Sequence, residues 1–104
     1  MTEHEINFNY SKAMGQAAEL KNIAKSLASI GNNDLEDCLG SVEKNWKGTN
    51  SEDYVKKGKK VQTKISTSSQ NINAAASAIE SMAKRIYEAE MAALRAARER
   101  KYNH

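Results

Sequence analysis

An unbroken apolar repeat in the second half of the chain constrains its fold more than any other feature of the sequence. Apolar or small residues recur in alternating steps of four and three between residues 54 and 89. They are Tyr54, Gly58, Val61, Ile65, Ser68, Ile72, Ala75, Ile79, Met82, Ile86 and Ala89. This spacing is that of a heptad stripe, which packs lengthwise against a neighbouring helix. Because the chain has no proline to interrupt the repeat, it predicts one helix over residues 51–101.

The first half of the chain carries a similar but less regular stripe. Its members are Tyr10, Ala13, Ala17, Leu20, Ala24 and Leu27, and then Leu35, Cys38, Val42 and Trp46. The steps of three and four predict a helix over residues 10–46, in which Cys38 is a small core residue. Glycine and short polar residues around Gly31 weaken helical backbone bonding, so any kink or break is expected there. Residues 1–9 show no helical period and predict an extended lead-in.

Between the two stripes lies a segment that favours chain reversal. Gly48 can adopt the positive φ that ends a helix, and Thr49 with Glu52 has the spacing of a capping box. We therefore predict a turn at residues 47–50 and a single all-α domain over residues 1–104, folded as an antiparallel helix-turn-helix hairpin. The core residues expected for the hairpin or for a dimer are Leu20, Leu27, Val61, Ile65, Ile72, Ile79, Met82 and Ile86.

The second helix is predicted to extend beyond the first. A first arm that starts at Tyr10 can cover the second only to about residue 86, because the two helices have the same rise per residue. Residues 87–104, with their basic cluster, are therefore expected to project as an accessible recognition segment, and their removal to leave thermal stability nearly unchanged but to abolish recognition. Solubilising the rod and packing on a partner are the alternatives for this tail. A second apolar strip of Ala74, Ala78, Met91 and Leu94 predicts a further packing neighbour outside the chain.

The net charge of +3 hides opposite charges in the two halves of the chain. Residues 1–53 carry five bases and nine acids, and residues 54–104 carry eleven bases and four acids. This asymmetry suits antiparallel arms or a dimer whose acidic and basic faces meet, although two solvated faces would have the same pattern. The densest basic patch comprises Lys56, Lys57, Lys59, Lys60 and Lys64. It gives an alternative function, a cytoplasmic nucleic-acid-binding or coiled-coil scaffold protein, but no arginine or aromatic residue is interleaved with these lysines.

Residues that usually carry chemistry are sparse. The histidines are His4 and His104, one near each end, and Cys38 is the single cysteine. The sequence therefore offers no basis for a nucleophile with its base, a zinc site or a phosphate-binding glycine loop. We predict no enzyme activity, cofactor, metal or small-molecule substrate. We also find neither the roughly 18 apolar residues of a membrane span nor the pattern of a signal peptide, so we expect a protein made in the cytoplasm.

The segment at the predicted turn carries a resemblance to a known family. Residues 45–54, with Trp46, Gly48 and Tyr54, resemble the signature of the WXG family, the early-secreted-antigen-like proteins of type VII secretion. The likeness covers the whole chain, since an amphipathic arm flanks the motif on each side. It implies a hairpin that pairs into an antiparallel four-helix bundle, as a homodimer or heterodimer. It also implies secretion in folded form without a classical signal peptide, as a substrate or as an adaptor for a larger toxin.

The same resemblance implies a second recognition element near the carboxyl terminus. In the family, the turn motif acts with an aromatic-x-x-x-acid motif on a helix of the partner chain. Here Tyr87 is followed four residues later by Met91, so Tyr87 with Glu90 is a degenerate candidate. The partners implied are helical: a second copy, a related small protein or a larger toxin, together with the type VII secretion ATPase.

Overall fold

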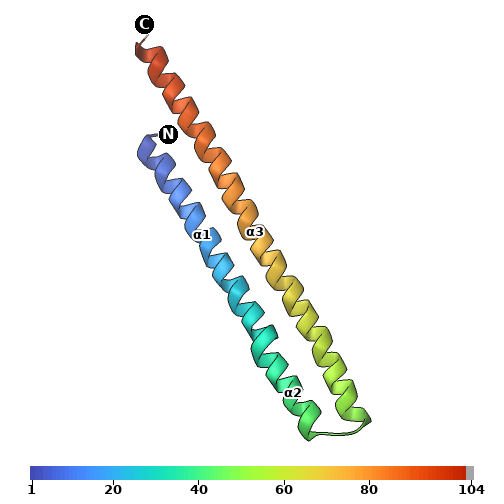
Figure 1. The fold of residues 1–104 in the computed structure, drawn as a ribbon. Helices are drawn as coiled ribbons and strands as arrows, with labels where there is room; N and C mark the ends of the chain where they lie inside the picture. The colour runs from blue at the N-terminus through green and yellow to red at the C-terminus, as the bar shows by residue number, and fades with distance from the viewer. Residues whose placement is uncertain (103–104) are drawn as a thin grey trace. The chain divides into compact units, whose positions relative to one another are not determined.

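The computed structural model describes residues 1–102, and every element in this range is helical. In chain order, the elements are α1 (Glu3–Ser29), the π-helix η1 (Ile30–Leu35), α2 (Glu36–Asn45) and α3 (Thr49–Tyr102) (Figure 1). Residues 1–102 contain no strand. The predicted all-α class is confirmed. None of the helices in this range is long and apolar enough to cross a membrane.

The chain divides into two compact units. The turn unit, Lys21–Asn73, holds the end of α1, then η1 and α2, and the first part of α3. It is a helix-turn-helix hairpin, since Glu43 of α2 and Lys59 of α3 form an ion pair across it. The terminal unit consists of Met1–Leu20 and the part of α3 from Ala74 onwards. Its two helical segments are antiparallel, because Glu3 pairs with Arg98 while Tyr10 contacts Tyr87.

The amino-terminal helix begins much earlier than the sequence pattern predicts. The Glu5 backbone N–H donates to Thr2 Oγ1, and the Thr2 hydroxyl donates to Glu5 Oε1, both at 3.2 Å. This reciprocal pair is a capping box, which satisfies two groups at the start of a helix. Ile6 is buried four residues before Tyr10 and extends the apolar stripe. The extended lead-in predicted for residues 1–9 is therefore wrong.

The reversal between the arms is shorter than the predicted turn at residues 47–50. Trp46 is extended, with φ −130° and ψ 117°, and ends α2. Gly48 has a φ of 123°, where only glycine is unstrained. Thr49 is already the first residue of α3, so the predicted capping box of Thr49 and Glu52 is not formed. Instead, the Ser51 hydroxyl donates to the Gly48 carbonyl oxygen at 2.7 Å.

The core of each unit is built mainly from small residues. In the turn unit, the buried positions are Ala24, Gly31, Leu39, Ser51, Val55 and Ser69. In the terminal unit, they are Ile6, Ala17, Ala76 and Ala83. Small side chains let two helix backbones approach each other closely. The two helices of each unit are therefore held together by close backbone packing and not by large interdigitating side chains. Of the predicted core residues, Leu20, Leu27, Ile65, Ile72 and Ile79 lie at the edge of this contact and are partly buried.

The buried stripe of α3 lies one position away from part of the predicted stripe. Val55, Ser69, Ala76 and Ala83 are buried, each one residue after a member of the heptad repeat. The cause is that at these places both the member of the predicted repeat and the residue directly after it are small or apolar. The sequence therefore contains two possible stripes, offset by one residue. Val61, Met82 and Ile86 are 50%, 52% and 54% exposed and do not belong to the core of either unit. Their placement in a dimer core stays a prediction.

The weak point predicted near Gly31 is where the first arm departs from α-helical geometry. Gly31 is buried within the π-helix η1. Cys38, predicted as a core residue, is exposed in α2, while its neighbour Leu39 is buried. The reason is that the extra residue in η1 rotates α2 about its axis. The side of α2 that is buried is therefore not the side that steps of three and four predict.

Candidate functional site

The turn of the hairpin brings together the three residues of the predicted motif. Trp46 leaves α2 in extended conformation, Gly48 reverses the chain, and Tyr54 lies in the second turn of α3. The ring centroids of Trp46 and Tyr54 are 6.1 Å apart, with planes tilted by 55°. Both rings remain about half exposed, at 50% and 51%. The indole therefore contacts the Tyr54 ring and keeps about half of its surface exposed.

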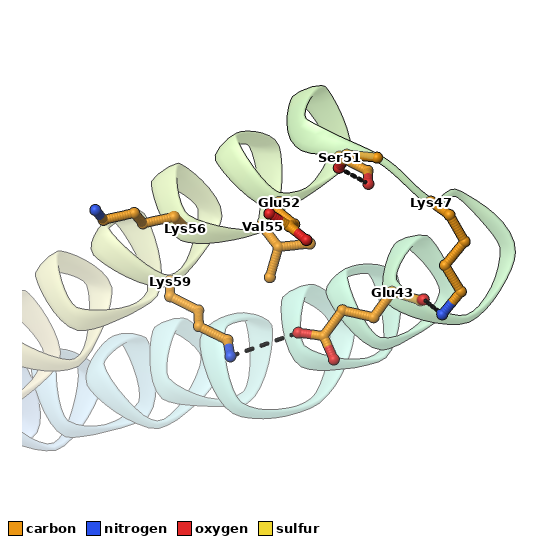
Figure 2. Close-up of a pocket in the computed structure, with 8 residues that line it drawn as sticks. Glu43, Lys47, Ser51, Glu52, Val55, Lys56 and Lys59 are labelled. Carbon is orange, nitrogen blue, oxygen red and sulfur yellow. Dashed lines mark hydrogen bonds and ion pairs between the residues drawn. The ribbon is translucent and has the colours of Figure 1, made fainter.

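An open groove lies beside the same turn, between α2 and the start of α3 (Figure 2). Its lining residues are Glu43, Lys47, Gly48, Ser51, Glu52, Val55, Lys56 and Lys59. Lys59 Nζ lies 3.5 Å from Glu43 Oε1, and Lys47 Nζ donates to the Glu43 carbonyl oxygen at 2.9 Å. Figure 2 shows that the ion pair bridges α3 and α2, whereas the Lys47 contact lies at the end of α2. Lysines and glutamates share the groove, so it suits a polar protein segment better than a single anion.

The carboxyl-terminal candidates lie in the terminal unit and contact its amino-terminal helix. The ring centroids of Tyr87 and Tyr10 are 4.7 Å apart. Tyr87, Glu90, Tyr10 and Ile6 line one groove. Arg98 donates to Glu3 Oε2 at 3.3 Å. The tail predicted to project from residue 87 is therefore covered to Arg98, because α1 begins at Glu3 and not at Tyr10.

Apolar side chains left exposed form a further candidate surface in each unit. In the turn unit, Ile23, Leu27 and Ile30 line a shallow depression on the outer side of the first arm. In the terminal unit, Met82 and Ile86 do the same on α3. The prediction from sequence missed Ile23 and Ile30. Ile23 lies four residues before Leu27 and Ile30 three residues after it, and this spacing could have indicated them. They were missed because they lie beside the predicted stripe of Leu20, Ala24 and Leu27.

The lysine patch of α3 is mostly unpaired with the first arm. Lys56, Lys57, Lys60 and Lys64 are exposed, while Lys59 pairs with Glu43. No arginine or aromatic ring lies among them in the sequence. Within residues 1–102, no three histidine, cysteine or acidic side chains gather as they would around a metal ion.

Comparison with known protein families, with curated proteins and with solved structures finds no match to this chain.

Proposed function

We propose that this protein is a non-enzymatic helical partner protein, exported by a type VII secretion system as a substrate or as an adaptor for a larger toxin. The observation that carries the proposal is the set of large apolar side chains left half exposed along the helices. Among them are Phe8, Ile23, Ile30, Val61, Met82 and Ile86. Ile23 with Ile30, and Met82 with Ile86, each line one depression, and neighbouring exposed apolar side chains on a helix favour association with another helix.

The energetic argument follows from the burial of these side chains. Covering one large aliphatic side chain completely stabilises a complex by about 1.5–3 kcal/mol. The side chains here are already about half buried, so each contributes about half of that when a partner covers it, and a stable complex needs several of them covered together to offset the cost of association. A partner that lays an amphipathic helix along Met82 and Ile86 gains this contribution in the terminal unit. One that covers Ile23 and Ile30 gains it in the turn unit.

The secretion part of the proposal rests on the turn motif. Trp46 and Tyr54 present a contacting aromatic pair beside Gly48, at the position where the WXG family carries its recognition motif. Burial of a half-exposed tryptophan by a secretion ATPase or a toxin domain gives one large contact at low entropic cost. Tyr87 and Glu90, held against the first helix by Tyr10, are the candidate second element.

A matched pair of substitutions tests the pairing. Met82→Arg places a charge within the exposed apolar surface, and Ser81→Arg places the same charge at the preceding residue, which is also exposed. We expect Met82→Arg to weaken self-association or binding of the co-expressed partner in light scattering, with unchanged helical circular dichroism. Ser81→Arg should behave as the unmodified protein. Equal association of both variants would refute a partner on this surface.

An export assay tests the role of the turn. Trp46→Ala should abolish appearance of the protein in the medium of a host with a functional secretion ATPase, while the purified variant stays helical. Tyr102→Ala, at a far more exposed aromatic position, is the control and should be exported normally. Export of the Trp46→Ala variant at the normal level would contradict the proposed recognition of the turn.

A further inference from the structure

The first arm of the turn unit contains one residue more than a regular helix can place on a single face. Its buried residues Ala24 and Gly31 are seven positions apart, but the next buried residue, Leu39, follows after eight. On α3, buried Val55 and Ser69 are fourteen positions apart, which is two regular heptads. The extra residue falls within η1, and a π-helical turn is the geometry that absorbs one additional residue.

Contacts from α3 hold the π-helical segment in place. Gln62 Nε2 donates to the Gly31 carbonyl oxygen at 2.9 Å and to Glu36 Oε2 at 2.6 Å. The first bond satisfies a carbonyl oxygen of the π-helical turn, and the second fixes the first residue of α2. Leu39 lies directly against Gly58, where a Cβ atom would overlap the Leu39 side chain. Gln62 and Gly58 therefore favour this position of α2.

The same sequence has a second way to pack α2. If η1 became α-helical, every residue after it would rotate by about 100° around the helix axis. Cys38, seven residues after Gly31, would then take the place of Leu39 against Gly58. Leu35 and Val42 are partly buried. Each lies three or four residues from both Cys38 and Leu39, so each can stay beside α3 in either arrangement. Two packings with an apolar residue at the same contact can differ by only a few kcal/mol.

We propose that η1 is a register switch, in which α2 exchanges between a π-helical register with Leu39 against α3 and an α-helical register with Cys38 there. Trp46 directly follows α2, so a change of register turns the indole around the helix axis. The switch thereby alters how the turn presents its aromatic side chain. It depends on the contacts of η1 and α2 alone, and it stands whether or not the protein is secreted.

Cys38 reports on the register without an added probe. Its thiol is exposed in the π-helical register and would be covered in the α-helical one. We expect Gln62→Met, which removes both hydrogen bonds, and Gly58→Ala, which crowds Leu39, to shift the full chain to the α-helical register. The rate of Cys38 labelling by a water-soluble disulfide reagent should then fall by about tenfold or more at unchanged helical circular dichroism.

Matched controls make these changes at positions without the contacts. Gln70→Met replaces an exposed glutamine of α3, and Gly40→Ala adds a methyl group where nothing lies within 4 Å. Both should label at the normal rate. Unchanged labelling in folded Gln62→Met and Gly58→Ala would overturn the switch. Faster labelling with loss of helical signal would also overturn it, because the contacts would then only hold the hairpin together.

Deletion of one exposed residue from η1 gives an independent test. Without Asn33, Leu39 lies seven residues after Gly31, so an α-helical first arm and the Leu39 packing become compatible. We expect this variant to remain helical with Cys38 reactive, and Gln62→Met in the same background to leave the labelling rate unchanged. A fall in labelling in that double variant, or unfolding of the deletion variant, would contradict the one-residue origin of the switch.

Discussion

Tyr10 and Tyr87 pack against each other, with ring centroids 4.7 Å apart and planes inclined by 37°. This contact joins α1 to a part of α3 that was expected to project into solvent. It reverses the expected effect of a truncation. Removal of residues 87–104 takes away the partners of Tyr10, Ile6 and Glu3, so we now expect the melting temperature to fall clearly.

The tyrosine contact itself can be tested by one substitution. Tyr87→Ala should lower the free energy of unfolding by about 1–3 kcal/mol, because it removes an aromatic pair and leaves space beside Tyr10. Tyr102→Ala, at a far more exposed ring in the same helix, should change it by less than about 0.5 kcal/mol. Thermal denaturation followed by circular dichroism measures both. Equal effects would show that the Tyr10–Tyr87 contact does not contribute.

A buried hydroxyl links the arms of the turn unit. The Ser69 hydroxyl donates to the Ala24 carbonyl oxygen at 2.7 Å. Ser69→Ala removes this bond and should cost about 1 kcal/mol in urea unfolding. Ser68→Ala, one residue earlier and exposed, should be neutral or slightly stabilising, because alanine favours helix. A reversed order of the two variants would place the buried face of α3 on the predicted stripe after all.

The start of α1 gives a prediction that separates helix from extended lead-in. Ile6 is buried, whereas Phe8 is mostly exposed. Ile6→Ala should destabilise the chain by about 2–4 kcal/mol, and Phe8→Ala should have little effect on the isolated protein. Hydrogen exchange of residues 6–10 should also be slow. Rapid exchange there, with a small effect of Ile6→Ala, would restore the extended lead-in.

The lysine patch allows a test of the alternative function. We expect Lys60→Ser combined with Lys64→Ser to leave association and helicity unchanged, since neither side chain is buried. Binding to duplex DNA should be weak and lost at physiological salt, as for any basic surface without base contacts. Tight binding that survives physiological salt and is lost in the double variant would favour a nucleic-acid-binding protein.

The helical class and the position of the turn could be predicted because their causes are local. A proline-free chain with apolar residues every three or four positions leaves few alternatives to helix. Within residues 1–102, Gly48 is the single glycine with a positive φ, and it lies between the two stripes in the sequence. The face of α3 was harder to predict, because Tyr54 and Val55, or Met82 and Ala83, are both suited to a core.

Two features could not be obtained from apolar spacing. The start of α1 depends on the side chains of Thr2 and Glu5, which form a capping box and carry no apolar period. The π-helix is contacted by Gln62, which lies 31 residues from the Gly31 carbonyl group to which it donates. A local pattern contains no information on such a distant hydrogen bond. Apolar spacing also could not separate the exposed apolar surfaces from the core. The residues beside the buried stripe recur with the same steps of three and four as the residues within it.

The small residues at the centre of both units have a consequence for how the protein persists in a cell. Alanine, serine and glycine remove little apolar area from water when they are buried. The free energy of unfolding of an unpaired copy is therefore expected to be small. We expect unpaired copies to be degraded quickly and paired copies to survive. Pulse-chase measurement should then show a half-life that lengthens when the partner is co-expressed. Under this condition, proteolysis itself adjusts the amount of this chain to that of its partner.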